Sequence, residues 1–165
     1  MVFGLSFKEK TAEAIQRGTK AALSGGFFHH TQAQKFNLND EATAWLYTQA
    51  LVHQIYMLGV LYKHSTMGKY KWATPDFLTK NIDSALTEHE IIEGLTPGTR
   101  RSFIFKRCIE MDNLTPKERE TGQHYHHSAK LVAEKDSNAN EASIARTLEG
   151  VVDSYFQQAR KMFGV

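Results

Sequence analysis

Histidine and carboxylate side chains occur in this chain at spacings that suit metal binding. His89 and Glu93 are four residues apart, as are Glu120 and His124, while His53 lies within a long uncharged segment. Residues four apart project from the same side of a helix, and facing helices can bring such pairs to one iron, manganese or zinc ion. These five residues are therefore the candidate metal ligands.

A tetrapyrrole is a second candidate cofactor, since histidines on facing helices can supply both axial ligands of a haem iron. His53 and His89 would take that role. However, the chain lacks the Glu-x-x-His tetrapeptide that di-iron bundles carry on two helices. The leading expectation is therefore a protein without a cofactor, in which these histidines form hydrogen bonds with neighbours in the core.

His53 also belongs to a polar strip on an otherwise apolar segment. Residues 42–62 contain no Asp, Glu, Lys or Arg, which is the pattern of a membrane span or of a helix buried in a bundle. Gln49, His53 and Tyr56 follow one another at intervals of four and three residues, so they share one helix face. Polar groups at the middle of a bilayer are costly, which favours a buried helix and no membrane span.

Basic residues gather beside aromatic residues in two other places. Lysines flank Tyr70 and Trp72, and Lys or Arg side chains surround the segment from Phe103 to Phe105. Proteins that bind single-stranded nucleic acid combine rings that stack on bases with cations that contact phosphates. The net charge of only +2 makes this signal weak. RNA or single-stranded DNA binding is an alternative function, with the candidate contacts Lys69, Lys71, Arg100, Arg101, Lys106 and Arg107.

Helices are the elements that must position these side chains. Each of the three prolines follows a threonine, a pairing that suits an N-cap and the first helical residue. With these starts, apolar spacings of three and four residues predict helices over about 6–23, 40–65, 75–93, 98–112, 116–135 and 139–163. We expect residues 1–165 to form one all-α domain, with residues 1–5 outside its ordered part. About five to six mostly antiparallel helices should form a bundle around the buried helix 40–65.

The C-terminal helix has the widest apolar face. Phe156, Met162 and Phe163 extend this face nearly to the end of the chain. An apolar surface larger than the core requires usually marks an interface. No P-loop, nucleophile-elbow or zinc-protease motif occurs, which argues against an enzyme. The leading functional expectation is a bundle that acts through protein–protein contacts, as a homo-oligomer or as a subunit of a larger assembly.

Cysteine content and the first residues bear on the compartment. Cys108 is the one cysteine in the chain, so an internal disulfide is excluded. A reducing compartment is the usual location of such proteins. The first ten residues lack the basic and long apolar stretches of a secretory signal. We therefore expect a cytoplasmic protein.

Overall fold

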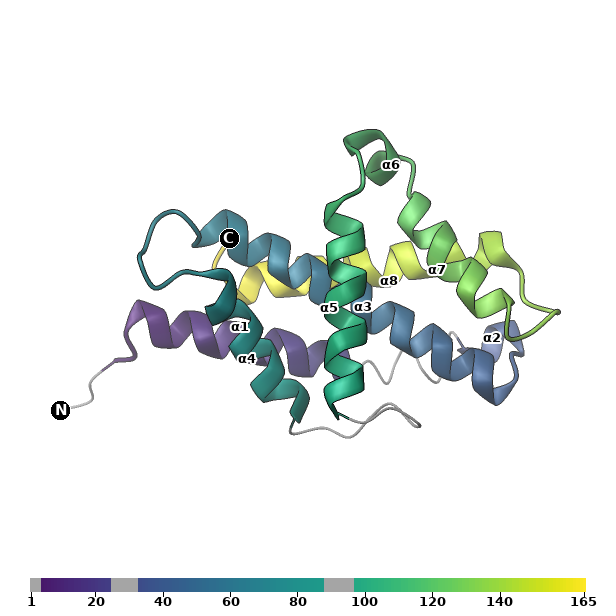
Figure 1. The fold of residues 1–165 in the computed structure, drawn as a ribbon, viewed down its shortest axis with the longest axis horizontal. Coiled ribbons are helices and arrows are strands. Elements are labelled where there is room, and N and C mark those ends of the chain that lie inside the picture. Colours follow the sequence, from purple (N-terminus) through teal and green to yellow (C-terminus); the bar gives the residue numbers. More distant parts are fainter. Residues whose placement is uncertain (1–3, 25–32, 88–96) are drawn as a thin grey trace.

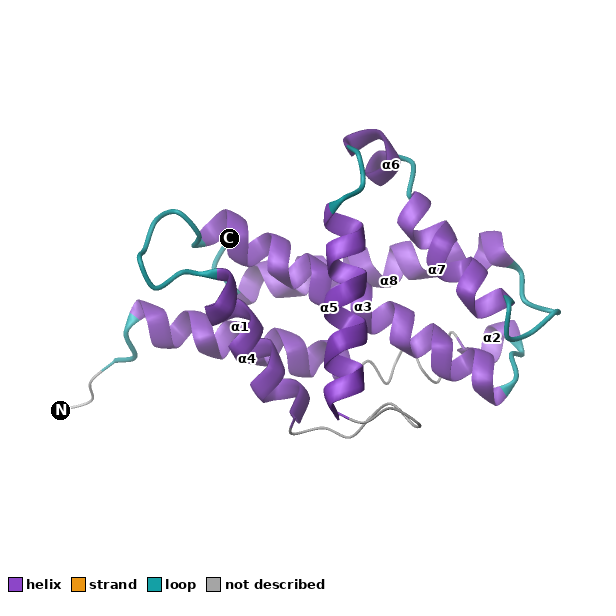
Figure 2. Cartoon of the chain, viewed as in Figure 1, coloured by secondary structure: helices purple, strands orange, loops and turns teal. Residues whose placement is uncertain are grey.

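The computed structural model describes residues 4–24, 33–87 and 97–165. All regular secondary structure within these ranges is helical, and they contain no strand (Figure 2). The expected all-α class is therefore confirmed. Of the five N-terminal residues expected to lie outside the ordered part, residues 1–3 are outside the described ranges.

The described ranges contain six helices of eleven residues or more and two short ones. The long helices are α1 (Phe7–Leu23), α3 (Asp40–Ser65), α4 (Pro75–Thr87), α5 (Pro97–Asp112), α7 (Gln123–Ala133) and α8 (Glu141–Met162). The short helices are α2 (Ala33–Phe36) and α6 (Pro116–Glu120). Most of these bounds agree with the expected ones, because apolar periodicity and capping residues are local signals.

Side-chain caps explain where three of these helices begin. Asn39 accepts a hydrogen bond of 2.8 Å from a backbone N–H in the first turn of α3. Thr115 and Glu118 form a reciprocal capping box at the start of α6. Thr74 accepts a hydrogen bond of 3.2 Å from the Phe77 N–H at the start of α4. Each cap satisfies a backbone donor that the first turn leaves unpaired, and the predicted starts are confirmed.

One predicted helix is divided in the structure. The segment 116–135 forms α6 and α7, which are separated at Thr121 and Gly122. Gly122 has a φ of 69°, a left-handed conformation that breaks an α-helix and that glycine adopts without strain. The expectation of one continuous helix is corrected accordingly. The predicted helix 75–93 is helical to Thr87, and its remaining residues lie outside the described ranges.

Helix α3 is the central helix of the bundle, as expected. It contacts α1, α5, α7 and α8. α1 and α7 run antiparallel to α3, while α8 lies beside α3 and runs in the same direction (Figure 1). The Asn39 N–H, just before α3, donates 2.8 Å to the Asp136 carboxylate beyond the end of α7. α5 crosses α3 steeply (Figure 1), and Arg107 in its C-terminal half reaches Ser128 of α7.

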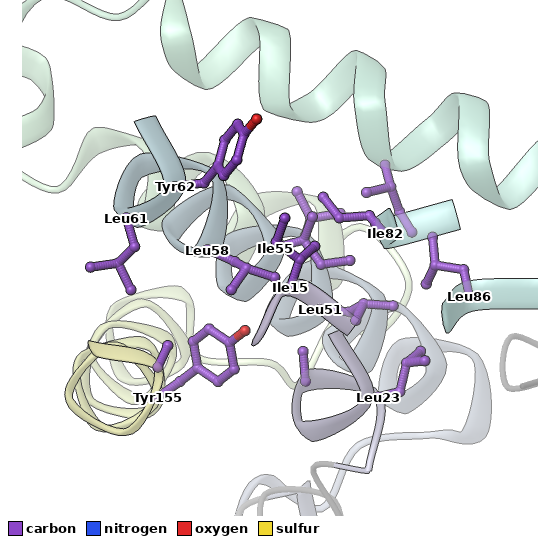
Figure 3. Packing of buried hydrophobic residues seen from close by; sticks show 14 of the residues in the cluster. Ile15, Leu23, Leu51, Ile55, Leu58, Leu61, Tyr62, Ile82, Leu86 and Tyr155 are labelled. Atoms are coloured by element: carbon purple, nitrogen blue, oxygen red, sulfur yellow. The ribbon is translucent and has the colours of Figure 1, made fainter. Parts of the chain in front are cut away.

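The described residues form two apolar clusters in the core. The first joins α1, α3, α4, α5 and α8, with Leu58 and Tyr155 among its buried residues (Figure 3). The second joins α3, α7 and α8. Along α3, the fully buried residues of the second cluster extend to Ala50, and those of the first begin at Leu51. Gln49 and His53 therefore lie where the two clusters meet.

No helix in the described ranges is both long and apolar enough to cross a lipid bilayer. The longest of them, α3, includes the buried polar residues Gln49, His53 and Gln54. These polar side chains lower the mean hydropathy of the uncharged segment 42–62.

Candidate functional site

A buried polar cluster lies where α3, α5 and α7 meet. Its centre is the Ser128 hydroxyl on α7, which donates its proton to Gln49 Oε1 at 2.9 Å. The Ser128 oxygen, Oγ, also accepts a hydrogen bond from Arg107 Nη2 at 3.2 Å and lies 2.7 Å from His53 Nε2. A hydroxyl has one proton and two lone pairs. With its proton given to Gln49, Ser128 must accept from His53, so the proton of the imidazole is on Nε2.

Burial keeps the His53 side chain neutral. The residue is 1% exposed. Burial lowers the pKa of His53 well below its usual value, and the nearby His124, Arg107 and His127 lower it further. The ring packs against His124 and Tyr125, with centroid distances of 5.5 Å and 4.8 Å. A neutral imidazole is the form that a low-dielectric site favours.

The contact between Ser128 and His53 is structural. A serine nucleophile needs its hydroxyl proton directed at the base that will remove it. Here that proton is directed at Gln49, and Ser128 has no exposed surface. The contact therefore joins α3 to α7 and lacks the geometry of an activated nucleophile.

The cluster contains three unpaired nitrogen atoms. Gln49 Nε2, Arg107 Nε and His124 Nδ1 are the buried side-chain polar atoms without a hydrogen-bond partner in the described part of the chain. An unpaired buried donor or acceptor costs about 1–3 kcal/mol, so such atoms are uncommon unless another molecule pairs with them. All three come from one cluster, which marks it as the candidate binding site.

A pocket adjoins this cluster. Its volume is about 320 Å³, and it lies between the C-terminal half of α5, the following loop and the first turn of α7. This volume is at the lower end of the range for small-molecule sites, about 300–1,000 Å³. Two of the three residues with unpaired atoms, Arg107 and His124, line the pocket. The complete lining is Arg107, Glu110, Met111, Leu114, Gln123, His124 and His127.

The pocket has a buried cation on one side. Arg107 is 6% exposed, and its Nη1 forms an ion pair with Glu110, whose side chain is 45% exposed. His124 faces the same pocket, and burial, Arg119 and Arg107 lower its pKa in that order. The two guanidinium groups thus disfavour a third positive charge at His124. An anion bound in the pocket would instead favour the positive charge and raise the pKa of His124.

A second pocket, of about 530 Å³, lies between α2 and the start of α8. Lys35 and Arg146 are among its lining residues. None of the buried unpaired atoms in the described ranges belongs to its lining. The pocket beside Arg107 is therefore the better candidate for a ligand site.

The structure brings together two of the five candidate metal ligands. His53 and His124 pack against each other, whereas Glu120 is exposed at the end of α6. His89 and Glu93 lie outside the described residues. Within the described ranges, no group of three or more His, Cys, Asp or Glu side chains is placed to hold a metal ion. In the haem hypothesis, coordination of iron by His53 Nε2 would replace the contact that this atom makes with Ser128.

The polar strip on α3 has two sets of partners. Gln49 and His53 both meet Ser128 on α7. Tyr56 instead faces α5, where burial and the negative charge of Asp112 raise the pKa of its phenol. The strip therefore contacts the two helices that line the pocket.

The nucleic-acid candidates are divided between surface and interior. Lys69, Lys71 and Lys106 are exposed. Arg107 was expected at the surface and is buried, because α5 directs it toward Ser128. Arg100 and Arg101 belong to α5, but their side chains are not described.

The candidate interface residues are half-buried. Phe156 and Phe163 pack against the first apolar cluster. Met162, which precedes Phe163 in the sequence, is partly exposed. Part of their apolar surface is thus used by the protein's own core. The expected protein–protein contact at this face stays a prediction.

Sequence reasoning missed Ser128 and the buried role of Arg107. A signal for Ser128 was present, since it lies three residues after Tyr125 and four before Val132, on the buried face of α7. Arg107 had the same kind of signal, since it lies three residues after Ile104 and four before Met111, which are both buried in α5. No family model, curated protein or solved structure matches this chain.

Proposed function

We propose that this protein binds a small organic anion, with a carboxylate or phosphate group, in the pocket between α5 and α7. The observation that carries the proposal is the pair of unpaired nitrogens, Arg107 Nε and His124 Nδ1, on residues that line one pocket. Two helices thus contribute residues with unpaired buried nitrogens to the wall of one pocket. A carboxylate or phosphate supplies the acceptor oxygens that a guanidinium pairs with most strongly.

The guanidinium is held in place before any ligand arrives. Its Nη2 donates to Ser128, and its Nη1 pairs with Glu110. A donor fixed by its neighbours loses little conformational entropy when it binds. Nε is the remaining guanidinium donor and has no hydrogen-bond partner, and Arg107 as a whole is only 6% exposed.

The rest of the pocket suits the apolar part of an organic anion. Met111 is buried and Leu114 is half-buried, both at the C-terminal end of α5 or just after it. His127 and Glu110 are exposed at the rim. Small-molecule sites commonly combine such apolar walls with a few polar groups that fix orientation. The ligand class is therefore an anion with a short apolar body.

Binding is tested by calorimetry with three probes: inorganic phosphate, succinate and phenyl phosphate. We expect phenyl phosphate to bind more tightly than inorganic phosphate, because its ring can contact Met111 and Leu114. Arg107→Lys keeps the positive charge but removes Nε and the planar fork, and should weaken binding by about tenfold or more. His127→Ala at the rim should weaken it less.

Arg146→Lys in the second pocket is the matched control, because it makes the same chemical change away from the unpaired atoms. Binding should be unchanged in this variant. The proposal is wrong if none of the three probes binds at concentrations up to about 10 mM, since even a weak site of this kind has a Kd near or below about 1 mM. It is also wrong if Arg107→Lys and Arg146→Lys bind the probes equally well.

A further inference from the structure

Four aromatic rings form a cluster at one end of the molecule. Phe7 at the start of α1 packs against Tyr70 and Trp72 in the loop between α3 and α4, with centroid distances of 5.0 Å and 6.0 Å. Tyr70 and Trp72 stack on each other at 5.3 Å with planes 23° apart. Trp72 also meets Phe77 of α4 at 5.0 Å. We call these four residues the ring cluster.

The ring cluster is anchored on one side and open on the other. Trp72 and Phe77 are partly buried against the first apolar cluster. Phe7 is 49% exposed and Tyr70 is 43% exposed. They are two of the five large hydrophobic side chains that stand exposed in the described ranges. Adjoining exposed rings form a contiguous apolar patch, and such patches often mark interaction sites.

Lysines surround the ring cluster. Lys8 Nζ lies 5.9 Å from the centroid of the Phe77 ring. Lys69 and Lys71 are exposed on both sides of Tyr70 in the loop. Of the acidic residues next to the cluster in sequence, Glu9 is engaged in the capping box of α1, and Asp76 is exposed in the first turn of α4. Three cations against two carboxylates leave one excess positive charge beside the exposed rings.

We propose that the ring cluster binds single-stranded nucleic acid. Bases would stack on Phe7 and Tyr70, and the phosphates between them would contact Lys8, Lys69 and Lys71. Successive bases and phosphates match this alternation of ring faces and cations. A protein partner fits less well, because lysine is depleted in the centres of protein interfaces. This site is independent of the pocket beside Arg107, which lies on α5 and α7.

Fluorescence anisotropy of a labelled 12-nucleotide oligo(U) tests the proposal on the full chain. At about 50 mM salt we expect binding that weakens steeply as salt increases. Tyr70→Ala should weaken binding by about tenfold, as expected for the loss of one stacked base. Tyr70→Phe keeps the ring and should bind like the unaltered protein.

Charge is tested with two double variants of equal net charge. Lys69→Glu/Lys71→Glu changes the ring cluster, and Lys117→Glu/Lys130→Glu changes exposed lysines of α6 and α7. We expect the first to weaken binding and to flatten its salt dependence, and the second to do neither. Circular dichroism confirms that each variant is folded.

Three results would overturn the proposal. The first is no anisotropy change even at about 20 mM salt, where the electrostatic term is strongest. The second is equal weakening by both double variants, which shows an unspecific effect of net charge. The third is binding to phosphatidylserine vesicles, lost in Tyr70→Ala, without binding to the oligonucleotide, since this identifies a membrane-surface site.

Discussion

The phenolic hydroxyl of Tyr155 on α8 donates a hydrogen bond of 2.8 Å to the backbone carbonyl of Gly18 on α1. A Cβ atom at residue 18 would lie 2.6 Å from Leu58 Cδ1 and 3.3 Å from the Tyr155 hydroxyl. Helices α1, α3 and α8 can therefore approach this closely because residue 18 has no side chain. Figure 3 shows Leu58 and Tyr155 in this part of the core.

Gly18→Ala should lower the free energy of unfolding by about 1–3 kcal/mol, since overpacking forces neighbours out of their rotamers. Urea denaturation gives the value. Gly150→Ala in α8 is the control, because a Cβ there meets no atom within 4 Å. That substitution should raise stability by about 0.5–1 kcal/mol through helix propensity. Equal effects of the two substitutions would show that the crossing at Gly18 is not tight.

Ser128→Ala should be the costliest small substitution in α7. It removes the shared partner of Gln49, His53 and Arg107, and it leaves their buried atoms unpaired. We expect a loss of about 2–4 kcal/mol, because a buried charged group loses a hydrogen bond along with two neutral ones. Thermal and urea unfolding measure this. Ser154→Ala on the exposed face of α8 should change stability by less than about 0.5 kcal/mol.

Stability should fall as the pH drops below about 6.5, the usual pKa of histidine. The folded state lowers the pKa of His53, chiefly by burial, so in this range the unfolded chain binds more protons than the folded one. The contribution is therefore fully present above the unfolded pKa and is lost as the pH falls toward the folded pKa. The lowered pKa of His124 acts in the same direction.

His53→Gln separates the two histidines. It keeps a side-chain N–H for Ser128 but cannot be protonated, so the dependence of unfolding free energy on pH should become shallower. His126→Gln, on the exposed face of α7, is the control and should leave that dependence unchanged. Identical pH profiles for the unaltered protein and His53→Gln would contradict the buried, neutral state of this imidazole.

Anion binding should raise the pKa of His124. Burial, Arg119 and Arg107 lower this pKa in the free protein, and a bound carboxylate or phosphate offsets the repulsion from the two arginines. Binding then takes up a proton, so the affinity for the fully ionised form of the probe should increase as the pH falls toward the usual histidine pKa of about 6.5. NMR titration of the His124 ring protons, with and without phenyl phosphate, measures the two pKa values. An unchanged pKa with saturating ligand would place the anion elsewhere.

Most helix positions could be predicted from the sequence because their causes are local. Asn39, Thr74 and Thr115 act on backbone groups within three residues, and the apolar spacing of α8 repeats within one turn. Gly122 shows the limit of this reasoning. A glycine within a helical pattern is compatible with a continuous helix or a break, and here the chain adopts the positive φ that breaks it.

The candidate site could be predicted only in part. Gln49 and His53 were recognisable because a polar pair in an apolar helix needs partners. Their shared partner, Ser128, lies 75 residues beyond His53 on another helix, and Arg107, which donates to Ser128, comes from a third helix. Periodicity within one helix carries no information about which residue of another helix lies opposite.

The sequence by itself determined the all-α class, the starts of the capped helices and the presence of polar residues in the central helix. These properties follow from backbone capping and apolar periodicity, which act over a few residues. Only the tertiary structure decided that α5 and α7 meet α3 at Ser128, that Arg107 is buried beside a pocket, and that Phe7 joins Tyr70. The physical reason is that packing, desolvation and charge proximity depend on distances in space between residues far apart in the chain.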